Sequence, residues 1–102
     1  MSDVEYQSGE RLFEWDSDKA ALNWQKHTVD FEEAAKVFDD PNRIEQFDEE
    51  HSVEEERWIT VGMVSRILFV VYTERDEVTR IISARKANAK ERRDYYACAE
   101  SY

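Results

Sequence analysis

The chain has 102 residues, of which 41% are hydrophobic, 13% aromatic and 37% charged, and its formal net charge is −10. This length and apolar content suit one small domain with its own core and exclude a largely disordered chain. Only two glycines and one cysteine are present, which excludes a phosphate-binding glycine loop, a dinucleotide-binding motif, a disulfide framework and a paired-cysteine zinc or redox site.

The sequence indicates a cytoplasmic protein without a membrane anchor. Its single cysteine, Cys98, suits a reducing compartment. The longest purely apolar run, Ile67 to Tyr72, is far shorter than the roughly 20 residues that cross a bilayer. The first ten residues are polar and acidic, unlike a secretory signal.

Charge is divided unevenly along the chain. Residues 1–56 hold 5 Lys and Arg against 18 Asp and Glu, a net −13, whereas residues 57–102 hold 9 against 6, a net +3. The acidic whole repels nucleic acid at long range, but the basic second half could still present a local face that binds anions. The alternative is that the acidic surface serves solubility alone.

Residues 1–10 are predicted to be a disordered tail, and residues 11–102 a single folded domain. At the start of this domain, residues 11–16 alternate charged and apolar side chains, which is typical of a short strand with one buried face.

Two helices are predicted next. Asp16 or Ser17 can cap the first, which runs to about Lys26. Two of its apolar residues are best placed to pack, Ala20 and Trp24. Asp30 can cap the second helix, which ends before Pro41. Its core-facing positions follow helical spacing: Phe31, Ala34, Ala35 and Phe38.

The rest of the chain predicts strands and a closing helix. The strand segments are residues 43–48, 56–63, 66–73 and 78–85. The third is apolar on both faces, so we expect a middle strand covered on both sides. Asn88 and Glu91 can cap the last helix. This order predicts an α+β domain: an antiparallel β-sheet, two N-terminal helices packed on one face, and a C-terminal helix. The last helix or a partner protein would cover the other face.

Cationic side chains gather on or beside the last three predicted strands. They are Arg57, Arg75, Arg80, Arg85 and Lys86. Guanidinium forks match phosphate oxygens, and several of them together can stabilise a transition state of phosphoryl transfer. Each arginine could instead pair with one of the 24 carboxylates. Strand alternation also puts Arg80 and Arg85 on opposite faces unless a bulge intervenes.

Two histidines are candidates for proton transfer, because imidazole titrates near neutral pH. His27 adjoins Lys26 at the end of the first helix and is the candidate we favour over His51. A metal site from both histidines and Asp48 lacks a recognised ligand spacing, so no metal is predicted. Tyr95 could stack on an unpaired base, or it could pack the last helix on the sheet.

A series of short motifs, in this order and spacing, resembles the BrnT toxin family over about residues 12–96. They are Phe13-Glu14-Trp15-Asp16, Lys19-Ala20, Asn23, Lys26-His27, Phe31-Glu32-Glu33-Ala34, Val37-Phe38, Asp40-Pro41, His51-Ser52, Glu55-Glu56-Arg57, Gly62, Tyr72-Thr73-Glu74-Arg75, Arg80-Ile81-Ile82-Ser83-Ala84-Arg85-Lys86-Ala87, Glu91-Arg92-Arg93 and Tyr95. Two positions depart from the family pattern. Thr28 stands where the family usually has glycine, and Asp76-Glu77 replace a more common Asp-Gly.

The resemblance implies a RelE-like fold and an endoribonuclease that blocks translation by cutting RNA. It also implies a BrnA-type antitoxin with a ribbon-helix-helix domain, so that operator DNA is bound only through the antitoxin. A dimeric antitoxin would give a 2:2 complex.

Our leading hypothesis is a metal-independent endoribonuclease. Its expected catalytic residues are Lys26, His27, Arg57, Arg80 and Arg85, and its expected RNA-binding residues are Arg75, Lys86 and Tyr95. The net charge of −10 motivates an alternative, a non-catalytic module that binds an antitoxin-like ribbon-helix-helix partner. A protein that binds DNA by itself is poorly supported, because no basic recognition helix follows a turn.

Overall fold

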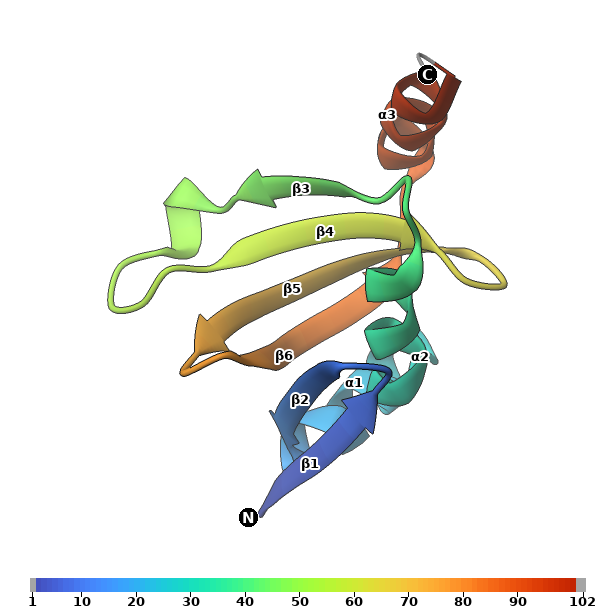
Figure 1. The fold of residues 1–102 in the computed structure, drawn as a ribbon. Coiled ribbons are helices and arrows are strands. Elements are labelled where there is room, and N and C mark those ends of the chain that lie inside the picture. Colours follow the sequence, from blue (N-terminus) through green and yellow to red (C-terminus); the bar gives the residue numbers. More distant parts are fainter. Residues whose placement is uncertain (1, 101–102) are drawn as a thin grey trace.

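A six-stranded sheet with the order β1-β2-β6-β5-β4-β3 organises the protein, shown here as a computed structural model that describes residues 2–100 (Figure 1). The elements are β1 (Asp3–Ser8), β2 (Arg11–Asp16), α1 (Ser17–His27), α2 (Phe31–Lys36), the 3-10 helix η1 (Val37–Asp39), β3 (Ile44–Phe47), the 3-10 helix η2 (Glu49–His51), β4 (Trp58–Met63), β5 (Ile67–Arg75), β6 (Val78–Lys86) and α3 (Ala89–Glu100). The ends of the predicted tail and domain, Met1, Ser101 and Tyr102, lie outside the described residues.

The prediction of a disordered N-terminal tail is wrong. Residues 3–8 form β1, which pairs with β2 in an antiparallel hairpin turned at Gly9, whose φ is 61°. Polar residues alternate along β1 with Val4 and Tyr6, which pack against the core, and the ring of Tyr6 lies 5.6 Å from that of Trp15. The alternation of Val4 and Tyr6 with polar residues is therefore the pattern of a strand with one buried face.

The prediction of a wholly antiparallel sheet is also wrong. β2 pairs with β6 in parallel, with Leu12 opposite Val78 and Glu14 opposite Arg80, and the other strand pairs are antiparallel. After β2 the chain crosses through α1 and α2 before the remaining strands form. It returns to the side of β2 only with β6, and it then runs in the same direction.

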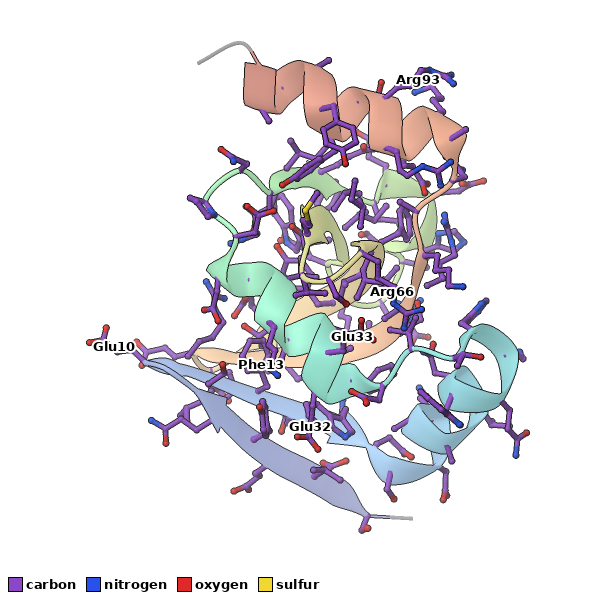
Figure 2. All side chains as sticks on the ribbon, turned by 90° about the vertical axis from the view of Figure 1, so that its right-hand side faces the viewer. Glu10, Phe13, Glu32, Glu33, Arg66 and Arg93 are labelled. Carbon is purple, nitrogen blue, oxygen red and sulfur yellow. The ribbon has the colours of Figure 1, made fainter. Side chains whose placement is uncertain are left out.

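One face of the sheet packs against α1 and α2, as the sequence predicts. Its buried side chains are Phe13, Trp15, Val29, Phe31, Ala34, Ala35, Val37, Leu68, Val70, Ile81 and Ala84. The expected caps are present: Asp16 Oδ1 accepts from the Asp18 N–H at 2.8 Å and Asp30 Oδ1 from the Glu33 N–H at 2.7 Å. In Figure 2, Arg66 from the β4–β5 turn points toward Glu33 of α2, and these two side chains form a bidentate ion pair at 2.8 and 2.9 Å.

The residue that docks α1 is Asn23 rather than Trp24, which is 52% exposed. The Asn23 amide donates to the carbonyl of Ala84 at 2.8 Å and to that of Val29 at 3.0 Å, and its oxygen accepts from the Ala84 N–H at 3.1 Å. Strand β2 pairs only with the first part of β6, so Asn23 satisfies the outer edge of β6 where no strand lies beside it.

Three residues other than glycine adopt left-handed backbone conformations at the two positions that depart from the family pattern. Thr28, with φ 55°, ends α1, and Asp76 and Glu77, with φ 51° and 68°, form the β5–β6 turn. Glycine has no steric penalty in this region, which explains why it is the more usual residue at such positions.

The opposite face of the sheet is covered only in part. Tyr95 of α3 packs with Val61, Ile67 and Ala87, and α3 lies near one end of the sheet, beyond the start of β3 (Figure 1). The Asn88 and Glu91 caps form as predicted, each accepting from the other's N–H at 2.9 Å. The last helix is therefore a partial cover, and the rest of this face is open.

A bulge in β6 decides which side chains reach this open face. Ser83 lies opposite Val71 and Ile81 opposite Tyr72, so Ile82 is an extra residue in the strand. Ile81 and Ala84 both face the core beneath α1 and α2. Their neighbours Arg80 and Arg85 consequently lie on the same face, the open one.

Candidate functional site: a groove on the open face

The open face carries a groove of about 480 Å³ between the β3–β4 connection and β6. Its apolar floor is formed by Ile59, Phe69, Val71 and Ile82, all partly buried. Its charged and polar lining consists of Gln46, Asp48, Glu50, His51, Arg57, Ser83 and Arg85. The structure thus brings together Arg57 and Arg85, two of the predicted catalytic residues, over a surface on which bases could rest.

Arg57 is fixed in place through its backbone. It directly precedes β4, its N–H donates to Ser52 Oγ at 2.9 Å, and its carbonyl accepts from the Asp48 N–H at 2.9 Å. Within residues 2–100, its guanidinium group makes no hydrogen bond or ion pair, and the residue is only partly exposed. Arg57 therefore offers the groove a cation that is not paired with a carboxylate from the described part of the chain.

Arg85 is held on one edge and open on another. Nη1 and Nη2 donate to Glu91 at 2.8 and 2.9 Å, Nη1 also donates to the Lys86 carbonyl at 3.1 Å, and the group lies 3.9 Å above the ring of Phe69. A guanidinium has five N–H donors, so Nε–H and the second Nη2–H keep no partner among the described residues. These two form a fork that fits two phosphate oxygens.

The Arg85–Glu91 pair also affects the carboxylate. Partial burial alone would raise the pKa of Glu91, but the hydrogen bonds from Arg85 and from the Asn88 N–H outweigh it and hold the pKa below its usual value. Glu91 is consequently a stable anion that orients Arg85 and leaves its other edge free.

Two other predicted cations are paired with carboxylates outside the groove, the alternative that the sequence leaves open for each arginine. Arg80 lies 3.1 Å from Asp3 and 3.5 Å from Glu14, and the hydrogen bond to Asp3 raises its pKa. Arg75 forms a bidentate pair with Glu55 at 2.9 and 3.0 Å. Arg80 shares the face of Arg85, but neither Arg80 nor Arg75 lines the groove.

The remaining predicted residues do not line the groove either. Lys26 and His27 are exposed in the last turn of α1, the helix that packs on the other face, and Lys86 is exposed at the end of β6. Tyr95 is 4% exposed and donates to Asp40 Oδ2 at 2.6 Å. Burial, and then this hydrogen bond, raise its pKa to about 12. It therefore packs α3 on the sheet, which was the open alternative to stacking on a base.

The histidine in the groove is His51, whereas the sequence favours His27 for proton transfer. Its Nδ1 lies 3.0 Å from Asp48 Oδ2. The signal that could have favoured it is the carboxylate three residues earlier, at the spacing of a single 3-10 turn. Within the described residues, His, Cys, Asp and Glu side chains form no group of three that could hold a metal ion.

Comparisons with known proteins identify the family. The family model described as "Ribonuclease toxin, BrnT, of type II toxin-antitoxin system" matches residues 15–91, so β1 and most of β2 precede the match. Among solved structures, the chain is similar to the ribonuclease toxin BrnT of Brucella abortus, with a TM-score of 0.53 and 20% identity over 72% of this chain and 92% of that one. This likeness shows a shared α+β fold. No curated protein matches the sequence significantly.

None of the helices within residues 2–100 has the length and apolar content of a membrane span. The family match extends over well more than half of the chain, and it agrees with the structural likeness to the Brucella abortus toxin. The chain therefore belongs to the BrnT family of ribonuclease toxins from type II toxin–antitoxin systems.

Proposed function

We propose that this chain cleaves RNA in the open-face groove by acid–base chemistry that needs no metal ion. The observation that carries the proposal is the pair of guanidinium groups above a partly buried apolar floor. Among residues 2–100, Arg57 has no carboxylate partner and Arg85 keeps two N–H groups unbonded. Two arginines can hold the non-bridging oxygens of one phosphodiester, while the floor accepts the neighbouring bases.

RNA supplies its own nucleophile, so the protein's task is positioning and proton transfer. A base takes the proton of the 2′-hydroxyl, the 2′-oxygen bonds to the adjacent phosphorus, and the bond from phosphorus to the 5′-oxygen breaks as that oxygen gains a proton. Negative charge builds on the phosphoryl oxygens during this step. Arg57 and Arg85 would stabilise that charge more strongly than the charge of the ground state.

The other expected site residues have smaller parts in this proposal. Arg75 and Arg80 could contact RNA only after their ion pairs with Glu55 and Asp3 open. Lys86 directly follows Arg85, which lines the groove, and we expect it to contact a flanking phosphate. The roles expected of Lys26 and His27 stay predictions, and they would require RNA to reach the end of α1.

A type II toxin–antitoxin family implies an antitoxin partner. We propose a BrnA-type antitoxin with a ribbon-helix-helix domain, in a 2:2 complex that binds operator DNA through the antitoxin only. Support comes from the open face, where Ile59, Phe69 and Val71 line the groove and stay partly exposed. An antitoxin on this face would block the groove directly. A RelE-like arrangement of helices against the sheet also belongs to this proposal.

The test is cleavage of single-stranded RNA by purified protein free of antitoxin, in excess EDTA. We expect cleavage, and we expect Arg57→Ala to slow it by about 10²–10³-fold, the usual cost of removing one preorganised donor to a transition state. Arg93→Ala is the matched control, because Arg93 is exposed and points away from the sheet on α3 (Figure 2).

Cleavage that requires added metal would contradict the mechanism. Intact RNA under all conditions, together with tight antitoxin binding and normal growth on expression, would favour the non-catalytic module. That alternative has one supporting observation, the acidic lining that Asp48 and Glu50 add to the groove.

A further inference from the structure

We infer that His51 is the general base of the RNA cleavage reaction and that Asp48 is the residue that positions it. The inference rests on the proposed function and deepens it, because that proposal leaves the proton-transfer group open. The carrying observation is that a carboxylate-bound imidazole lines the same groove as Arg57 and Arg85.

Asp48 fixes which nitrogen of His51 is basic. Its carboxylate oxygens lie 3.0 and 3.2 Å from Nδ1, and an ionised carboxylate only accepts hydrogen bonds, so Nδ1 is the N–H donor. The lone pair of the neutral imidazole is then on Nε2, at the far side of the ring. The Asp48 side chain is 11% exposed and that of His51 61%, so the carboxylate is enclosed while the ring is open to a substrate.

Hydrogen bonds that join Asp48, Ser52 and Arg57 fix the position of His51 relative to Arg57. Ser52 Oγ donates to the Asp48 carbonyl at 2.5 Å and accepts from the Arg57 N–H at 2.9 Å. The Asp48 N–H donates to the Arg57 carbonyl at 2.9 Å. The turn that carries the imidazole is therefore attached to the residue that we expect to bind the phosphate.

Charged side chains of both signs surround His51. Asp48 and Glu50 line the groove with it, and Glu54 and Glu55 line the adjoining hollow, where Glu55 is already paired with Arg75. Arg57 and Arg85 are the cations of the groove, and a bound phosphodiester would occupy them. Binding of RNA thus places an anion between the arginines and the histidine.

Nε2 of His51 takes the proton of the 2′-hydroxyl, the 2′-oxygen bonds to phosphorus, and the bond from phosphorus to the 5′-oxygen breaks. Solvent water gives the leaving 5′-oxygen its proton. The products are a 2′,3′-cyclic phosphate and a 5′-hydroxyl, and the imidazolium returns its proton to solvent.

The experiment measures the single-turnover rate constant on single-stranded RNA for His51→Ala, His51→Gln and Asp48→Asn. We expect the His51 variants to lose about 10²–10⁴-fold, the usual contribution of general acid–base catalysis, and Asp48→Asn to lose less. His51→Gln keeps a polar side chain beside Asp48, which separates chemistry from folding. Affinity for the same RNA with 2′-deoxy sugars should be unchanged.

Two readouts distinguish a base from a structural residue. Added imidazole should restore part of the rate to His51→Ala and none to Arg57→Ala. A substrate with sulfur in place of the 5′-oxygen needs no acid, so it should leave the defect of His51→Ala intact. Glu49→Gln is the control within the same turn, because Glu49 does not line the groove.

Several results would overturn the inference. If both His51 variants cleave at the wild-type rate while Arg57→Ala is defective, His51 is not the general base, but the proposed function stands. A large loss in His27→Ala with none in His51→Ala would transfer the role to the other histidine. Recovery of His51→Ala on the sulfur substrate would make His51 the acid. Wild-type protein that cuts no RNA would refute both proposals.

Discussion

Replacing Tyr95 with phenylalanine removes one hydroxyl at the contact between α3 and the loop before β3. The lost bond is 2.6 Å long, its acceptor is the Asp40 carboxylate, and the residue is 4% exposed. A hydrogen bond to a charged partner contributes about 1.5–3 kcal/mol. Asp40 Oδ2 keeps the Met63 N–H at 2.8 Å, so we expect the lower part of that range, about 1.5–2 kcal/mol.

The assay is urea unfolding of both proteins at neutral pH, followed by the same measurement as pH rises. The folded pKa of Tyr95 is raised from 10.0 to about 12, so its contribution is complete below pH 10.0 and is lost as pH approaches 12. The stability gap between wild type and Tyr95→Phe should therefore close over that interval. Tyr72, whose pKa is also raised by burial and by Glu45, is present in both proteins and cancels.

Tyr96→Phe is the matched control, because Tyr96 is the adjacent tyrosine and is 47% exposed. It should cost little. A loss below about 0.5 kcal/mol in Tyr95→Phe, or equal losses in both variants, would refute the reasoning that this hydroxyl fixes α3.

Three further substitutions test the fold by urea or thermal unfolding. Gly62→Ala should cost about 1–2 kcal/mol, because the new Cβ would lie 2.7 Å from Cγ1 of fully buried Val37; an unchanged midpoint would contradict this. Asn23→Ala should cost about 3 kcal/mol, because it leaves the N–H and carbonyl of Ala84 without partners; a loss below about 1 kcal/mol would refute that role. Glu77→Gly should stabilise the protein by about 0.5–1 kcal/mol, because its φ is 68°, and a lower melting temperature would be the opposite result.

Local patterns in the sequence predicted most elements because the signals for them are local. The caps at Asp16, Asp30 and Asn88 depend on residues within one turn, and each forms as expected. The parallel pairing of β2 with β6 joins residues 12–14 to residues 78–80, and nothing in either strand specifies the direction of its neighbour. That information lies in the crossover through the helices, which only the assembled chain reveals.

The grouping of the candidate site residues in space was predicted less well, for two physical reasons. Alternation alone separated Arg80 from Arg85, and the bulge at Ile82 that unites their faces has no clear sequence signal. In the sequence, His27 stands beside the cation Lys26, and this favours it over His51. Burial of Asn23 and the neighbouring core docks α1 on the covered face, so His27 lies away from the groove. His51 lines the groove instead.

The carboxylate of Glu91 caps the N-terminus of α3 by accepting from the Asn88 N–H, and it also accepts a hydrogen bond from Arg85. Unravelling the first turn of this helix would thus release the guanidinium, and pulling the guanidinium away would fray the turn. The first turn of α3 and the orientation of Arg85 thus depend on the same carboxylate. A molecule that binds the beginning of α3 would therefore change the position of this guanidinium without entering the groove.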